Sequence, residues 1–238
     1  MEKTVLIAGM EYPFCETFVN YAVQNGHNAM VTLLPNSQDV QRPVAPIAGF
    51  AWNRSSPISA RSLVLETENT FGNLDYAFIV FDTVLYTKEF EKMNTELISR
   101  ATDTLFSGYM YLCSELLEKF IKKGKGNLCF ILKKHLSLID GAKSKLRSDT
   151  LFSSPLVMSG EAAFQSFAEG IAVQYASSPV GVYLIESSKN LNEASDFNPW
   201  LYQYLEAAST KPVVNPKNAS KWIAEGTKFS AGWQLFNK

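Results

Sequence analysis

The sequence predicts an α/β fold with a single doubly wound domain, in which helices cover both faces of a roughly seven-stranded parallel sheet. Short apolar runs alternate along the chain with longer stretches of helical period. The apolar runs lack polar alternation, which is typical of strands buried on both faces. No linker or internal repeat divides residues 1–238, so we expect one domain.

The first half of the chain contains four of the predicted strands. They are Val5–Ala8, Ala29–Leu34, Leu63–Leu65 and Tyr76–Phe81. A helix follows the first strand and ends near Gly26, because glycine is common just beyond a helix. Residues 35–59 hold four prolines, and we expect an irregular surface segment there.

The second half contains the longest helical period, from about Thr95 to Lys123. Gly124 ends this helix after two lysines, which suit the negative end of the helix dipole. Ser154 and Pro155 predict a capped start for a further helix, because serine caps a helix and proline suits its first turn. The remaining predicted elements are the strands Leu128–Leu132, Val180–Ile185 and Trp233–Phe236, and a helix over about Pro199–Ala208.

The composition narrows the function classes. The 238 residues are 46% hydrophobic, with 22 Lys and Arg against 23 Asp and Glu, so the chain has no basic excess for nucleic acid. The cysteines Cys15, Cys113 and Cys129 lie far apart, and only His27 and His135 are present, which excludes a disulfide framework and disfavours a metal site. Because no signal peptide or membrane span is recognisable, we expect a cytoplasmic protein without a membrane partner.

Several segments resemble the short-chain dehydrogenase/reductase family in order and spacing over nearly the whole chain. Leu74-Asp75 and the apolar run after it resemble the family's fourth strand, and the basic segment Lys122–Leu128 resembles its entry to the fifth strand. Glu161-Ala162-Ala163 falls where the catalytic helix has Lys-Ala-Ala, and Ser230–Leu235 resembles the closing strand. The resemblance implies a Rossmann-like fold and, in the family, a nicotinamide cofactor.

The cofactor positions of this family are altered. The family's first turn reads Thr-Gly-x-x-x-Gly-x-Gly, and only Gly9 is retained, with Pro13 and Cys15 at the other two glycine positions. Glycines there let backbone amides approach a diphosphate, whereas Pro13 lacks an N–H and Glu11 adds a negative charge. Gly9 and Glu66, the acidic residue expected after the third strand, are the vestigial cofactor-binding candidates. A turn glycine and an exposed glutamate also need no ligand to explain them.

The catalytic positions are altered as well. By spacing, Val157 stands at the family's tyrosine, Glu161 at its lysine, Lys133 at its serine and Leu105 at its asparagine. Valine cannot donate a proton, and a glutamate would raise the pKa of a neighbouring phenol. We therefore assign no catalytic residue, and we expect no cofactor unless the chain is an NAD(P)-dependent enzyme with a non-standard site.

Charged residues near the strand ends could form a substitute site. Lys133, Lys134 and His135 follow the fifth strand, and Asp82 follows the fourth. A lysine beside a carboxylate in a cleft can transfer protons if its pKa falls. The alternative is that these lysines form a solvated loop or pair with Asp82 or Glu161.

Three functions are consistent with these observations. The first is a catalytically inactive relative, a pseudoenzyme that binds a partner or a small ligand; if side chains close the cleft above Gly9, Tyr12 and Phe14 are the nearest. The second is an NAD(P)-dependent oxidoreductase with a relocated site. The third is binding of an anion or a nucleotide by Arg54, Arg61 or Lys133 without redox chemistry, although we expect the two arginines to be solvated surface charges.

The chain is also expected to form a homodimer or a homotetramer. Two of its helices carry apolar side chains on more than one face, and such helices must be buried in the core or against another subunit. The residues concerned are Tyr109, Met110, Cys113 and Leu117 on the long helix, and Phe164 and Phe167 on the helix after Pro155.

Overall fold

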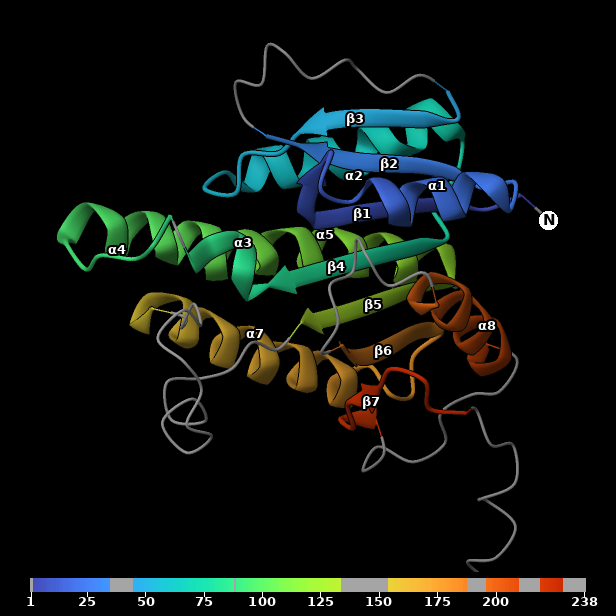
Figure 1. Ribbon diagram of the computed structural model, residues 1–238. Helices are drawn as coiled ribbons and strands as arrows, with labels where there is room; N and C mark the ends of the chain where they lie inside the picture. The colour runs from blue at the N-terminus through green and yellow to red at the C-terminus, as the bar shows by residue number, and fades with distance from the viewer. Residues whose placement is uncertain are drawn as a thin grey trace, which may run out of the picture.

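The computed structural model describes residues 2–34, 45–87, 89–133, 154–187, 196–209 and 219–228. These residues form a seven-stranded sheet of order β3-β2-β1-β4-β5-β6-β7, in which all neighbouring strands run parallel (Figure 1). The strands are β1 (Thr4–Tyr12), β2 (Asn28–Leu33), β3 (Ile47–Ala51), β4 (Tyr76–Asp82), β5 (Gly126–Lys133), β6 (Val180–Ser187) and β7 (Ile223–Ala224). The predicted fold class is confirmed.

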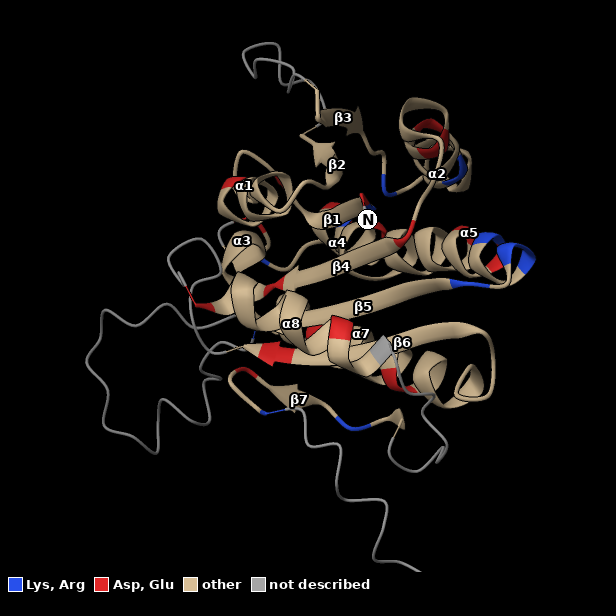
Figure 2. Cartoon of the chain, turned by 90° about the vertical axis from the view of Figure 1, so that its right-hand side faces the viewer, with Lys and Arg blue, Asp and Glu red and all other residues tan. Residues whose placement is uncertain are grey.

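Helices lie on both faces of the sheet. They are α1 (Glu16–Gln24), α2 (Pro57–Phe71), α3 (Thr83–Thr87), α4 (Thr95–Thr102), the π-helix η1 (Asp103–Ser107), α5 (Gly108–Lys123), α7 (Pro155–Gln174) and α8 (Phe197–Ser209). Figure 2 shows α2, α5 and α7 on one side of the sheet and α1 and α8 on the other. None of the described helices combines the length and apolarity needed to cross a membrane.

The two layers of helices bury two separate hydrophobic cores. Leu6 and Phe81 of the central strands face the core beneath α2, α5 and α7. Ile7 and Phe78 face the core beneath α1 and α8. Since both faces of each central strand are covered, these strands need apolar residues at consecutive positions, which explains their lack of polar alternation.

The predicted helix ends are confirmed at two places. Gly124 follows α5 with φ +70°, a conformation that glycine adopts without a Cβ penalty. The Ser154 Oγ accepts a hydrogen bond from the Val157 N–H over 3.4 Å, and Pro155 begins α7. The long predicted helix runs through α4, η1 and α5, with a π-helical turn in its middle.

The third strand was predicted in the wrong place. Leu63–Leu65 lie in α2, where Leu63 and Val64 belong to the stripe that packs on the sheet. The third strand is β3, inside the segment that we expected to be irregular. As an edge strand with partly exposed side chains and Gly49, it carries only a weak apolar signal. The predicted strand Trp233–Phe236 lies outside the described residues. Within the described residues, the seventh strand is β7.

Candidate functional site

The candidate site lies at the carboxyl ends of the strands, where the strand order reverses between β1 and β4. Ligands of open α/β sheets bind at this position. A pocket of about 410 Å³ opens there, and its lining includes Glu11 at the end of β1, Trp52 and Arg54 after β3, Tyr86 of α3 and Asp103 of η1. We call it the Arg54 pocket.

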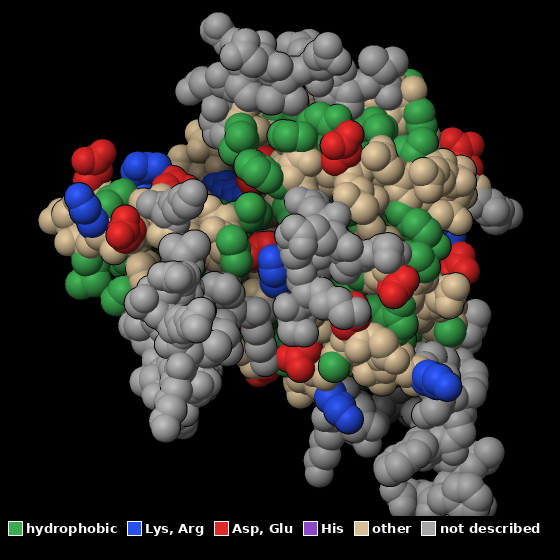
Figure 3. Space-filling model, viewed as in Figure 1, with side chains coloured by type: hydrophobic (Ala, Val, Ile, Leu, Met, Phe, Trp, Pro, Cys, Tyr) green, Lys and Arg blue, Asp and Glu red, His purple; other side chains and the backbone are tan. Residues whose placement is uncertain are grey.

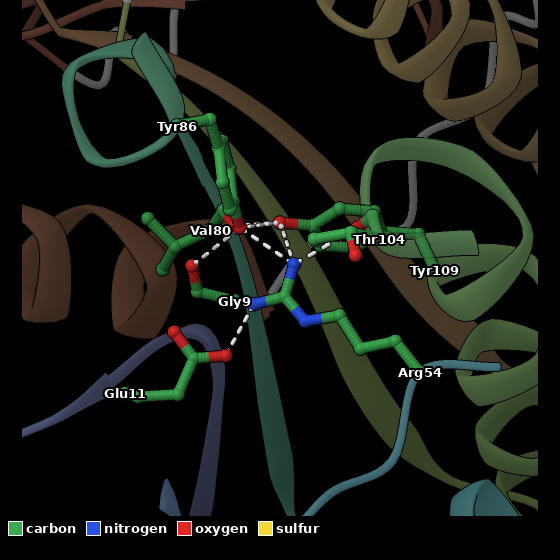
Figure 4. Close-up of polar contacts among 7 residues, drawn as sticks. All are labelled: Gly9, Glu11, Arg54, Val80, Tyr86, Thr104 and Tyr109. Carbon is green, nitrogen blue, oxygen red and sulfur yellow. Dashed lines mark hydrogen bonds and ion pairs between the residues drawn. The ribbon is translucent and has the colours of Figure 1, made fainter. Parts of the chain in front are cut away.

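Arg54 is the central residue of this site. Its side chain is only 8% exposed, and its Nη2 pairs with the Glu11 carboxylate (Figure 4). Its Nη1 donates to the Tyr86 Oη over 2.6 Å and to the Thr104 carbonyl over 3.0 Å, and it lies 3.3 Å from the Tyr109 Oη. Both terminal nitrogens of the guanidinium are therefore engaged within the protein. The prediction that Arg54 is a solvated surface charge is wrong.

Three aromatic rings surround the same guanidinium. Its Cζ lies 4.8 Å from the ring centre of Trp52, 5.4 Å from that of Tyr86 and 5.2 Å from that of Tyr109. A cation is attracted to the faces of such rings, most strongly where water is excluded. We call Trp52, Tyr86 and Tyr109, together with the Glu11 carboxylate, the Arg54 cage.

The two tyrosine hydroxyls connect the cage to the sheet. The Tyr109 O–H donates to the Val80 carbonyl of β4 over 2.9 Å, and the Tyr86 O–H reaches the Gly9 carbonyl of β1 over 3.1 Å. The two hydroxyl oxygens lie 2.8 Å apart. Buried polar groups are costly without partners, so this network requires all its members together.

Burial and charge set the protonation of the cage. Burial alone would lower the pKa of Arg54, but the Glu11 carboxylate raises it, and the net pKa lies well above the usual arginine value. Burial raises the pKa of Tyr86 and of Tyr109 above the usual phenol value, although Arg54 opposes this effect. The arginine therefore stays charged and the phenols stay neutral.

Two glycines allow the close approach that the cage needs. Gly9 has φ +92°, and a Cβ there would lie 2.0 Å from the Val80 carbonyl oxygen and 2.9 Å from the Tyr109 Oη. A Cβ on Gly108 would lie 2.6 Å from the Cβ of Arg54. Gly9 is thus required by the packing of β1 against β4 and Tyr109, independently of any ligand.

A short turn connects Glu11, near the end of β1, to the start of α1. The Phe14 N–H donates to the Glu11 carbonyl over 2.8 Å, and the Glu16 N–H donates to the Pro13 carbonyl over 3.0 Å. Cys15 stands at the N-cap without a side-chain cap, and burial together with Glu11 raises its pKa to about 12. Phe14 is 43% exposed and does not line the Arg54 pocket, so Phe14 does not close it.

A second polar cluster lies along the same edge of the sheet. Asp82, Lys133 and Ser187 occupy matching register positions at the ends of β4, β5 and β6. The Lys133 Nζ lies 3.2 Å from the Asp82 Oδ2, and both side chains are buried. Asp82 also accepts the Val84 N–H over 2.9 Å. The predicted alternative in which Lys133 pairs with Asp82 is confirmed, although the pair is buried and not solvated.

The other predicted positions do not join either cluster. Glu66 lies on the exposed side of α2, because the strand that would have ended before it is part of that helix. Arg61 is exposed and pairs with Glu115 over 3.1 Å, as a surface charge. Val157 and Leu105 are both buried in the core beneath α7. Lys134 and His135 lie outside the described residues. Within the described ranges, no three His, Cys, Asp or Glu side chains are grouped to hold a metal ion.

Sequence reasoning missed the cage because its members come from four separate segments. Glu11 and Arg54 are 43 positions apart, and Arg54 and Tyr109 are 55 apart. One signal was available in the sequence. Glu11 places a carboxylate beside the turn that binds a diphosphate in the family, and two negative charges repel each other. A buried carboxylate needs a cationic partner, but periodicity does not identify which arginine supplies it.

Sequence comparison with curated proteins gives a match over part of the chain. No family model matches the chain. An uncharacterized protein of Treponema pallidum (strain Nichols) is 32% identical over 80 residues, and this match spans 34% of the chain and only about a third (36%) of that relative.

Solved structures cover far more of the chain at low sequence identity. A protein of Bacillus thuringiensis provisionally described as a 3-oxoacyl-reductase has a TM-score of 0.63 at 10% identity, over 94% of this chain and 96% of its own. ElxO with NADP bound has a TM-score of 0.56 at 17% identity, over 79% of this chain and 73% of its own. The chain therefore has the Rossmann-like fold found in oxidoreductases of the short-chain dehydrogenase/reductase type.

Proposed function

We propose that this chain is a short-chain dehydrogenase/reductase-like protein that does not transfer hydride with a nicotinamide cofactor and instead binds a small ligand in the Arg54 pocket. The observation that carries the proposal is the ion pair between the buried Arg54 and the partly buried Glu11 at the carboxyl end of β1. In this fold the diphosphate of a dinucleotide lies at that end of β1, against the start of the next helix.

The residues at this turn do not fit a diphosphate. A diphosphate needs free backbone N–H donors and no neighbouring negative charge. Here the Phe14 and Glu16 amides already donate within the turn, Pro13 has no N–H, and the Glu11 carboxylate stands beside them. Arg54 does not compensate, because Glu11 neutralises its charge and its terminal nitrogens are bonded inside the cage.

The positions of the family's catalytic groups support the same proposal. Val157 and Leu105, which stand by spacing at the tyrosine and the asparagine, are fully or almost fully buried among apolar side chains. Neither side chain can donate or accept a proton, and general acid or base catalysis needs such a group within hydrogen-bond reach of the substrate.

The second candidate is an NAD(P)-dependent oxidoreductase with a relocated site. Its support is the buried pair of Asp82 and Lys133 at the carboxyl ends of β4 and β5, since charged groups buried at this edge are typical of active sites. Buried structural ion pairs look the same, so the two candidates must be separated by experiment.

Thermal unfolding with each nicotinamide cofactor tests the proposal. A site with a micromolar Kd would stabilise the fold by about 4 kcal/mol at about 1 mM ligand, which is an easily measured rise in Tm. We expect no rise with NAD⁺, NADH, NADP⁺ or NADPH. A rise with any of them, or hydride transfer to a panel of carbonyl compounds above a heat-inactivated control and lost in Lys133→Met, would establish the second candidate instead.

A further inference from the structure

The Arg54 pocket contains more negative than positive charge. Its two arginines are both paired: Arg54 with Glu11, and Arg100 with Glu89 over 2.5 Å. The remaining charged group of the lining is Asp103, whose carboxylate has no ion-pair or hydrogen-bond partner among the described residues. Charged side chains of both signs gather over α4, which leads into Asp103 (Figure 3). An anionic ligand would therefore meet no unpaired cation in this pocket, whereas a cationic ligand would meet a free carboxylate.

The wall of the pocket already binds a cation. The guanidinium of Arg54 is held by the faces of Trp52, Tyr86 and Tyr109 and by the Glu11 carboxylate. Trp52 and Tyr86 belong both to this cage and to the lining of the pocket. The internal guanidinium shows, independently of Asp103, that aromatic rings and a carboxylate of this wall surround an organic cation, an arrangement that attracts positive charge.

The size and the apolar lining define the rest of the ligand. The volume of about 410 Å³ lies in the range that holds small organic molecules. Leu34, which is partly exposed, and Trp52 provide apolar surface beside the charged groups. A ligand that uses both features has an ammonium or guanidinium group attached to an apolar body.

We infer that the Arg54 pocket binds a small organic cation of this kind, with the Asp103 carboxylate as its counterion. The inference rests on the proposed function, in which this pocket serves a ligand other than a dinucleotide.

A series of probes with one shape and three charges tests the inference. Benzylamine, benzyl alcohol and benzoate share the same ring and differ in charge, being positive, neutral and negative at pH 7. Titrations followed by ligand-observed NMR give the Kd of each probe. We expect benzylamine to bind at least about tenfold more tightly than benzoate, with benzyl alcohol between them. Equal affinities, or preference for benzoate, would overturn the inference.

Two variants locate the effect. Asp103→Asn should weaken benzylamine about tenfold and leave benzyl alcohol unchanged, because only the cation uses the carboxylate. Glu118→Gln removes the same charge from an exposed position of α5 outside the pocket, and it should leave both affinities unchanged. If the two variants weaken benzylamine equally, Asp103 is not the counterion and the inference fails.

Two measurements on the same protein, Tm with each cofactor and the Kd of each probe, distinguish failure of this inference from failure of the proposed function. A rise in Tm with a nicotinamide cofactor overturns the proposed function, whatever the probes do. Absence of charge preference among the probes, without a rise in Tm with any cofactor, overturns only the assignment of the ligand class.

Discussion

The guanidinium of Arg54 donates to the phenol oxygen of Tyr86 over 2.6 Å, and this bond joins the segment after β3 to α3, which follows β4. Tyr86 in turn reaches the Gly9 carbonyl of β1. The connections after β3 and β4 are thus tied to each other and to β1, at the point where the strand order reverses. In a dinucleotide-binding relative of this fold, the same place is left open for the ligand.

Removal of the Arg54 side chain should strongly destabilise the fold. Arg54→Ala leaves Glu11 partly buried without its cation and leaves the Tyr86 and Tyr109 hydroxyls with fewer partners. Loss of one member of a buried pair costs about 3–5 kcal/mol of the free energy of unfolding. Urea denaturation measures this loss. Arg61→Ala, which removes an exposed arginine of α2, is the control and should barely move the midpoint. Similar midpoints for the two variants would contradict the claim that the contacts of Arg54 in the cage stabilise the fold.

Gly9→Ala should destabilise the fold far more than Gly26→Ala. Both glycines have positive φ, +92° and +74°, so both substitutions carry the backbone penalty of about 1–2 kcal/mol. A Cβ at position 9 would also collide with the Val80 carbonyl at 2.0 Å, whereas no atom lies within 4 Å of a Cβ at position 26. The difference between the two urea midpoints measures the collision. Equal midpoints would mean that β1 and β4 can move apart at no cost.

The buried thiols should make stability fall at alkaline pH. Burial raises the pKa of Cys15 to about 12, and burial also raises the pKa of Cys113 and of Cys129. The folded state therefore keeps protons that the unfolded state loses above its thiol pKa of about 8.5. The free energy of unfolding should decline from about pH 9 towards pH 12.

Cys15→Ala should make this decline less steep, because one titrating thiol is removed. A thiol reagent at pH 8 provides a second measurement: the three cysteines should stay unmodified in the folded protein and react once urea unfolds it. Rapid labelling of the folded protein would show that the thiols are accessible.

We propose, as the sequence predicts, that the chain forms a homodimer or a homotetramer. Most of the apolar helix residues behind that prediction, such as Tyr109 and Phe164, are buried in the chain's own core. Ile98 of α4 and Phe106 of η1 remain exposed, by 43% and 36%, and line a groove of about 230 Å³ against α7. Sedimentation at micromolar concentration should show a dimer or a tetramer, and Ile98→Glu should dissociate it. A monomeric wild-type chain would contradict this proposal.

The sequence by itself predicted the parallel sheet, because its central strands are buried on both faces and carry consecutive apolar residues such as those of β4. It also predicted the C-terminal end of α5 and the start of α7, since Gly124 and Ser154 act through bonds to their immediate neighbours. Local pattern failed for β3, whose edge position leaves its side chains half exposed, and for Leu63–Leu65, whose apolar run serves a helix.

The tertiary structure alone decided the character of the candidate site. In the sequence, Glu11 already indicated that its carboxylate would repel a phosphate. Only the fold brings Arg54 to Glu11 from 43 positions away and places Tyr86 and Tyr109 around the same guanidinium. The burial of a charge depends on contacts between distant segments, and neither composition nor periodicity contains those contacts.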